Sequence, residues 1–288
     1  MDASELIRRV KRIELKSRGL SQNVFAGQYR SAFKGRGMSF SEVREYQTGD
    51  DVRDIDWNVT ARFNHPYVKV FEEERELTMM LLIDISGSTA FGSTQQTKRD
   101  LAIEIAATIA MSAIQNNDKI GAILFTDHIE KYIPPKKGRK HALLLIREMV
   151  STEPQSGKTD IGQALEFFSK VMKRRCSAML LSDFITQSSV QKPLQMVAGK
   201  HDLIAIHLFD PREQALPNVG LLYLEDAESG EHLLVDTQSK AVRKAIEKCQ
   251  QEQSSNVKQL LQKSKVDFAS ISTNDNYVQA LQKLMDRR

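Results

Sequence analysis

A short apolar run that ends in acidic and hydroxyl side chains is the feature that most restricts how this chain can fold. Residues 77–83 are mostly large and apolar, and Asp84-Ile-Ser-Gly-Ser88 follows at once. A run of this length that stops at polar residues is typical of a strand buried in a parallel sheet. Open α/β sheets carry their ligand sites at the carboxyl ends of the strands. Carboxylate and hydroxyl oxygens at that edge suit a hard divalent cation such as Mg²⁺.

Strand-like and helix-like segments alternate along the chain after this run. We expect strands at 77–84, 119–125, 178–181, 203–209 and 266–271, and helices at 97–116, 139–150, 160–173, 188–198 and 275–286. Such alternation predicts an α/β fold with a mostly parallel sheet and helices on both faces. Residues 129–133 follow a turn at Asp127-His128, and they would add one antiparallel edge strand.

One segment interrupts the alternation after Asp210-Pro211. Residues 221–236 predict a β-hairpin that turns around Glu228-Ser-Gly230. A long polar helix is expected next, over 238–263. We therefore predict an inserted β-hairpin plus helix at about 210–264.

The N-terminal part of the chain has a different character. Apolar residues spaced three and four apart predict a basic amphipathic helix over 4–17, and a glycine-rich loop is expected from 19 to 37. We therefore expect two parts, an N-terminal extension at 1–75 and a main domain at 76–288.

Charge is distributed unevenly along the chain. The net charge is +4, yet residues 1–36 carry nine Lys and Arg against three Asp and Glu. A basic helix of this kind can bind nucleic acid or an anionic membrane. We expect instead a solvated helix face, or pairing with the acidic segment at 42–56. Membrane contact stays open as an alternative, and nucleic-acid binding is not expected.

Composition favours a cytoplasmic protein. No apolar run approaches the roughly 20 residues that cross a bilayer. The N-terminus lacks the apolar core of a signal peptide. Cys176 and Cys249 are the only cysteines, too few for a disulfide framework or a thiolate metal site.

Two later polar positions repeat the pattern of Asp84 at a predicted sheet edge. Thr159 precedes a predicted helix, and Asp183 ends a predicted strand. Together with Ser86 and Ser88 they could converge on one cation. Such a cation would keep one position open to water or to an acidic group of a partner.

These five residues resemble the metal-ion-dependent adhesion site of von Willebrand factor A domains. The resemblance implies that Asp84, Ser86, Ser88, Thr159 and Asp183 hold Mg²⁺, or Mn²⁺ or Ca²⁺, with Asp183 acting directly or through water. It also implies a von Willebrand factor A-like, Rossmann-like fold. Lys158 departs from the pattern, which usually has a small residue there.

A second stretch resembles the signature of the domain-of-unknown-function 58 family. Its residues here include Arg44, Glu45, Tyr46, Gly49, Asp50, Asp51, Arg53, Asp56, Trp57 and Arg62. The resemblance implies a bacterial protein that works with a MoxR-type AAA+ ATPase in chaperone-like assembly, with no enzymatic activity of its own. The client protein would offer an acidic side chain to the metal.

The signature stretch itself alternates in charge. Alternating Arg and Asp side chains favour an intramolecular ion-pair network over a catalytic carboxylate cluster. Trp57 is expected to be a packing anchor rather than a platform for stacking.

Enzyme families fit the sequence poorly. Haloacid-dehalogenase phosphatases need a second Asp two residues after the first, where this chain has Ser86. Serine hydrolases need a Gly-x-Ser-x-Gly elbow, which Ile85-Ser-Gly-Ser88 does not supply. Gly157-Lys-Thr159 lacks the earlier glycine of a phosphate-binding loop, because Thr152 stands there. We therefore predict a metal-dependent adaptor that is not an enzyme. A metal-dependent phosphoester hydrolase and a peripheral membrane protein remain the alternatives.

Overall fold

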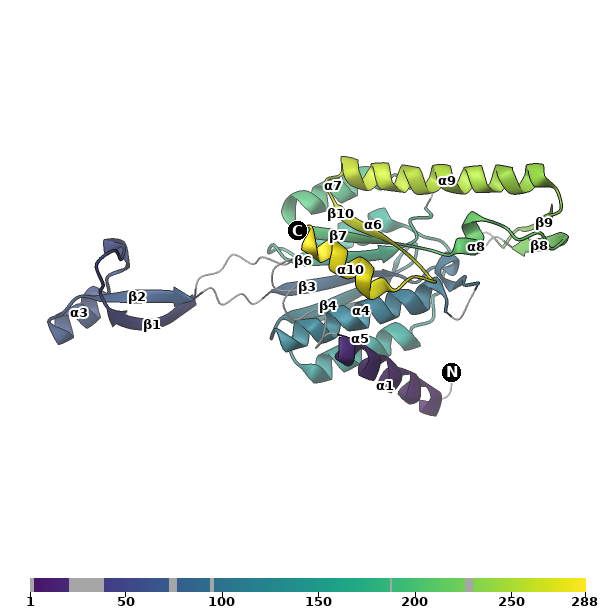
Figure 1. Cartoon of the computed structure of the whole chain (residues 1–288). Helices are drawn as coiled ribbons and strands as arrows, with labels where there is room; N and C mark the ends of the chain where they lie inside the picture. The colour runs from purple at the N-terminus through teal and green to yellow at the C-terminus, as the bar shows by residue number, and fades with distance from the viewer. Residues whose placement is uncertain (1–2, 21–38, 73–76, 94–95, 187, 226–229) are drawn as a thin grey trace. The chain divides into compact units, whose positions relative to one another are not determined.

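The computed structural model describes residues 3–20, 39–72, 77–93, 96–186, 188–225 and 230–288 (Figure 1). The chain divides into a larger unit, residues 1–32 with 78–288, and a smaller unit, residues 33–77. Within the described ranges, no helix has both the length and the apolar character needed to cross a bilayer.

Six strands form the central sheet of the larger unit, in the order β10-β7-β6-β3-β4-β5. Their bounds are β3 (Thr78–Asp84), β4 (Lys119–Phe125), β5 (Ile129–Lys136), β6 (Ser177–Ser182), β7 (Asp202–Phe209) and β10 (Asp267–Ser272). All neighbours are parallel except β5, which pairs antiparallel with β4 at the edge. This topology confirms the predicted mostly parallel sheet and its antiparallel edge strand.

Helices cover both faces of the sheet (Figure 1). One face carries α4 (Lys98–Gln115), α5 (Arg139–Ser151) and α10 (Tyr277–Asp286), and the other carries α6 (Ile161–Val171), α7 (Gln191–Lys200) and α9 (Lys240–Lys263). Because both faces are covered, β3 is buried continuously from its second residue to Asp84. Its even-numbered residues Met80 and Leu82 join the core that includes Phe168 of α6. The sheet thus carries Asp84 into the interior.

The inserted segment has the predicted hairpin and helix. It contains α8 (Pro211–Gln214), β8 (Leu221–Glu225), β9 (His232–Asp236) and then α9. The two strands pair antiparallel. The predicted turn at Glu228-Ser-Gly230 lies mostly outside the described residues.

The N-terminal helix α1 (Ala3–Leu20) packs on α4 and α5 of the larger unit. Ile13 and Ser17 are buried, Arg9 pairs with Asp100, and Lys16 lies 2.6 Å from Glu104. The helix was predicted, but the expected pairing with residues 42–56 is wrong for these two cations, because α4 supplies their acids. Most of the loop predicted at 19–37 lies outside the described residues.

The smaller unit is built on an antiparallel pair of strands. Its elements are β1 (Ser39–Glu45), η2 (Val52–Asp54), α3 (Trp57–Phe63) and β2 (Tyr67–Glu72). The sequence predicted only a strand at 68–71, because the short elements β1 and α3 lie in a stretch dominated by charged residues.

Charged side chains of the signature stretch pair with each other and cap short helices. Arg44 donates two hydrogen bonds, of 2.7 and 2.8 Å, to Asp50. Asp51 caps η2, and Asp56 caps α3 by accepting the amide hydrogens of its first turn. These carboxylates therefore have structural partners. Trp57 is 67% exposed, so it does not anchor packing within the smaller unit.

Candidate metal centre

Asp84 lies fully buried at the end of β3. Its Oδ1 accepts the Ser86 amide hydrogen at 3.0 Å, and its Oδ2 accepts the Ser182 hydroxyl at 2.6 Å. The first bond is the local turn that an Asp favours, and it fixes how the chain leaves the strand. The second ties the carboxylate to the neighbouring strand β6.

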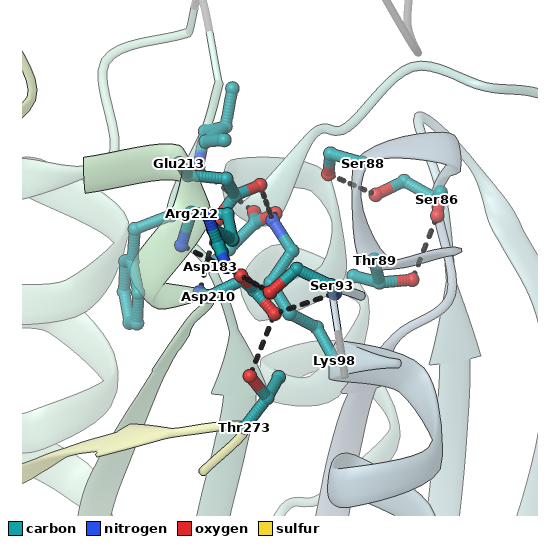
Figure 2. Close-up of polar contacts among 12 residues, drawn as sticks. Ser86, Ser88, Thr89, Ser93, Lys98, Asp183, Asp210, Arg212, Glu213 and Thr273 are labelled. Atoms are coloured by element: carbon teal, nitrogen blue, oxygen red, sulfur yellow. Dashed lines mark hydrogen bonds and ion pairs between the residues drawn. The ribbon is translucent and has the colours of Figure 1, made fainter. Parts of the chain in front are cut away.

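The two serines after Asp84 point their hydroxyls toward each other. The Oγ atoms of Ser86 and Ser88 are 3.1 Å apart, and both residues are buried. The short helix η3 (Gly87–Ala90) begins between them, and the Ser86 carbonyl accepts the Thr89 hydroxyl at 2.8 Å (Figure 2). The turn therefore holds two hydroxyl oxygens beside the buried carboxylate.

Thr159 lies on a loop that is hydrogen-bonded to the turn after Asp84. The Gly87 amide donates to the Gly157 carbonyl at 3.0 Å. Thr159 is 7% exposed, and its Oγ1 has no hydrogen-bond partner among the described residues. A buried hydroxyl without a partner costs about 1–3 kcal/mol. A bound cation would satisfy this oxygen.

Asp183 is held by a buried lysine. Lys98, at the start of α4, is completely buried, and its Nζ lies 2.7 Å from Asp183 Oδ2 and 2.6 Å from Glu213 Oε1 (Figure 2). The Ile185 amide donates to Asp183 Oδ1 at 3.1 Å. Burial alone would lower the pKa of Lys98, but the two carboxylates raise it above its ordinary value. Lys98 is therefore a cation at neutral pH.

The pKa of Asp84 is raised well above its ordinary value. Burial, and then the nearby carboxylate of Asp183, raise the pKa of Asp84 to about 7. Hydrogen bonds from Ser182 and Ser86 act in the opposite direction but do not offset burial. A divalent cation is often the largest local charge in such a site and would favour the ionised carboxylate.

Asp210 lies between β7 and α8 and accepts hydrogen bonds from several parts of the chain. It is buried and accepts hydrogen bonds from the Ser93 amide, the Thr273 hydroxyl and the Arg212 amide, at 2.9, 2.7 and 2.8 Å. It also forms a capping box with Glu213. This network holds α8 at the end of β7, where Glu213 reaches Lys98 (Figure 2).

Sequence reasoning missed Lys98, Asp210 and Glu213. The second and third carried a signal, because Asp-Pro-x-Glu has the N-cap, N1 and N3 residues of a capped helix. Lys98 carried none, since a lysine in the first turn of a helix is usually exposed.

The donor set fits a hard cation. Within the described part of the chain, no three His, Cys, Asp or Glu side chains are placed to hold a metal. A centre here must therefore use hydroxyl oxygens. Ser86, Ser88 and Thr159 would supply three, and Asp84 and Asp183 would supply charge. Oxygen donors of this kind are those that Mg²⁺ accepts. The metal assignment of these five residues stays a prediction.

Solved structures show similarity in fold. An aerotolerance-related membrane protein from Bacteroides fragilis NCTC 9343 is similar with a TM-score of 0.50 and 12% identity, covering 74% of this chain and all of that one (100%). The SpRpn10 VWA domain is similar with a TM-score of 0.39 and 13% identity, covering 74% of this chain and 96% of that one. At such identities the similarity concerns the fold alone. The mostly parallel sheet flanked by helices is von Willebrand factor A-like.

Sequence comparison identifies the family. The family model "Protein of unknown function DUF58" matches residues 42–256. The uncharacterized protein Rv1480 of Mycobacterium tuberculosis (strain ATCC 25618 / H37Rv) is 34% identical over 233 residues, which cover 80% of this chain and 73% of that protein. The matched region includes the smaller unit's signature from position 42 and the whole candidate metal centre. The chain therefore belongs to the DUF58 family and combines its signature stretch with a von Willebrand factor A-like fold.

Proposed function

We propose that this chain is a non-enzymatic adaptor that holds a divalent cation, with Mg²⁺ the first choice, and binds an acidic side chain of a partner protein through it. The observation that carries the proposal is the buried Thr159 hydroxyl, which lacks a hydrogen-bond partner among the described residues and lies on the loop bonded to Gly87. The raised pKa of Asp84 adds to it, because both features are relieved by a cation.

Each residue has a distinct part in this proposal. Asp84 supplies negative charge, and the hydroxyls of Ser86, Ser88 and Thr159 supply neutral oxygens. Asp183 already accepts bonds from Lys98 and from a backbone amide, so we assign it a water-mediated contact. A bound cation would supply Lewis acidity toward one further oxygen, and a partner carboxylate would provide that oxygen.

The arrangement around Asp84 supports binding over catalysis. A carboxylate nucleophile needs a free oxygen directed at substrate. Both oxygens of Asp84 accept hydrogen bonds, from the Ser86 amide and the Ser182 hydroxyl. This geometry argues against Asp84 as a nucleophile, and we propose recognition of a partner as the role of the centre.

We further propose a MoxR-type AAA+ ATPase as the working partner, in assembly or maturation of a client protein. Membership of the DUF58 family supports this partner, through the resemblance of the signature stretch. Because such an ATPase consumes ATP, we assign the pair to the cytoplasm.

Thermal unfolding in EDTA and in millimolar Mg²⁺, Mn²⁺ or Ca²⁺ tests the metal. We expect wild type to be stabilised by about 2.7 kcal/mol when the cation is at a hundred times its Kd. Asp84→Ala should lose this effect, whereas Asp286→Ala, at an exposed acid of the same unit, should keep it. Equal responses of wild type and Asp84→Ala would exclude the proposed centre.

Co-elution of the chain with a purified MoxR-type ATPase tests the partner. We expect a complex on size-exclusion chromatography in Mg²⁺. No complex under any nucleotide condition would remove the ATPase from the proposal and leave the metal centre to the unfolding experiment.

A further inference from the structure

A groove of about 1090 Å³ opens beside the candidate metal centre. Its walls come from the loops of the centre, the β8–β9 hairpin and α9. Ser88, one of the predicted ligands, lines it, and so does Glu213, which binds Lys98. The groove and the centre therefore form one continuous surface of the larger unit.

Large apolar side chains line much of this groove. They include Phe91, Phe184, Leu224, Leu233, Ile246 and Leu260. Phe91 directly follows η3, and its amide donates to the Ser88 carbonyl at 3.4 Å. Phe91 is 43% exposed and Leu233 is 64% exposed. Contiguous exposed apolar surface of this kind marks interaction sites.

The hairpin offers two neighbouring leucines, of which Leu233 lines the groove and Leu234 does not. Leu233 is paired across the strands with Leu224, and both line the groove. The next residue, Leu234, is paired with Tyr223, and neither lines it. Side chains of successive strand residues point to opposite faces. Leu233 and Leu234 are thus a matched pair for substitution, because they are exposed to a similar extent, 64% and 61%, and only Leu233 lines the groove.

We infer that the groove receives a segment of a partner protein in which one Asp or Glu is flanked by large apolar side chains. This inference rests on the proposed function, which supplies the cation for the acid. The acid would approach at the Ser88 end, and the apolar side chains would lie against the hairpin and α9.

The unpaired strand edges of the hairpin favour a protein segment over a small molecule. β8 and β9 form a two-stranded sheet of their own, so within the described residues each strand leaves one edge unpaired. Such edges can bind an extended peptide backbone.

A displayed library of random short peptides, selected on the full chain in millimolar Mg²⁺, tests the inference. We expect selected peptides to carry one acid beside large apolar residues. Their fluorescein-labelled forms are then measured by fluorescence anisotropy. We expect Leu233→Asp to weaken binding by roughly tenfold or more, as loss of a central apolar contact does. Leu234→Asp, with the same added charge, should change it by less than about twofold, because surface contacts outside a binding site contribute little.

The remaining outcomes separate this inference from the proposed function. If Mg²⁺ stabilises wild type but not Asp84→Ala, and both leucine variants bind the peptides equally, the groove is overturned and the metal centre stands. If the selected peptides bind equally in EDTA, or lack an acid, the inference is overturned as well. A selection that yields no binder above the Leu233→Asp background also overturns the inference. Mg²⁺-dependent dimerisation of wild type that is lost in Leu233→Asp overturns it as well, because the groove would then hold a second copy of this chain.

Discussion

Lys98 lies 2.7 Å from Asp183 with its ammonium group wholly removed from solvent. One acid of the candidate metal centre therefore has a counter-cation built into the chain. The same ammonium group reaches Glu213 on α8 at 2.6 Å, so it links the centre to the wall of the groove. A cation bound beside Asp84 and Asp183 would share the Asp183 carboxylate with this lysine.

Replacing Lys98 by methionine should separate its two effects. Without the ammonium group, the carboxylate of Asp183 is buried and unpaired, which typically costs 3–5 kcal/mol, so we expect a loss of about that size in EDTA. Loss of the positive charge should at the same time raise the affinity for Mg²⁺, because the ammonium group no longer repels the cation.

Chemical unfolding in EDTA and calorimetric titration with Mg²⁺ measure these two quantities for Lys98→Met. Lys192→Met, at an exposed lysine of α7, is the control and should change neither. Unaltered Mg²⁺ affinity in a folded Lys98→Met protein would show that the lysine and the cation do not share Asp183.

Thr159→Val should not destabilise the metal-free protein, and it should weaken metal binding. The Thr159 hydroxyl has no hydrogen-bond partner among the described residues, so its loss removes an unfavourable buried group. We expect metal-free stability to be unchanged or higher by up to about 1 kcal/mol. The stabilisation by Mg²⁺ should fall, because one ligand is missing.

Thr152→Val is the matched control for this substitution. Thr152 Oγ1 is also buried and without a partner among the described residues, but it is not one of the predicted ligands. Both variants should behave alike in EDTA, and only Thr159→Val should respond less to Mg²⁺. Equal Mg²⁺ stabilisation in the two proteins would remove Thr159 from the ligand set.

The central sheet could be predicted from the sequence, because its strands are buried on both faces. Burial of that kind leaves continuous apolar runs, such as the one that ends at Asp84. Thr159 and Asp183 could be added because each marks the end of a loop or strand at the same edge. The smaller unit could not be predicted in this way. Its helix α3 is only seven residues long, and it contains no buried residue.

Lys98 shows a second limit of sequence reasoning. A charged side chain is buried only where its partners are present, and the partners of Lys98 are 85 and 115 positions away in the chain. Periodicity and composition report local preference, so they assign such a lysine to the surface. The exposed Trp57 is the converse case, because large aromatic residues are usually buried.

His201 should make the protein less stable in mild acid. The residue is 1% exposed, its ring packs 4.7 Å from that of Phe168, and burial lowers its pKa from 6.5 to about 4. Below pH 6.5 His201 is protonated in the unfolded chain, whereas in the folded chain it stays neutral until about pH 4. Stability from this group is therefore complete above pH 6.5 and is lost as the pH falls toward 4.

Urea unfolding as a function of pH measures this effect. At about 1.4 kcal/mol per pKa unit, the contribution of His201 reaches at most about 3 kcal/mol. His201→Gln should lower the slope of stability against pH between these limits, whatever its effect at neutral pH. His232→Gln, at an exposed histidine, should retain the wild-type slope. Identical slopes in all three proteins would contradict the assignment.

Gly121→Ala should destabilise the sheet. A Cβ atom at this position of β4 would lie 2.7 Å from the Ile133 carbonyl oxygen and 2.8 Å from the Pro135 nitrogen. Both are backbone atoms of β5 and cannot turn aside, so we expect a loss of about 1–3 kcal/mol. Gly199→Ala is the control, since a Cβ atom there meets nothing within 4 Å and should be neutral or stabilising. Thermal unfolding of both variants distinguishes local crowding from a general intolerance of alanine.

The backbone of the smaller unit begins and ends at neighbouring points. Ser39 pairs with Glu72 in the antiparallel ladder of β1 and β2, so the two ends of this segment meet. A segment whose ends are adjacent can be inserted into a host domain without changing the path of the host backbone. Residues 39–72 could therefore be gained or exchanged in evolution as one inserted segment. The exposed Trp57 and the caps of its helix could be exchanged between proteins as a single piece, while the strands of the candidate metal centre keep their order.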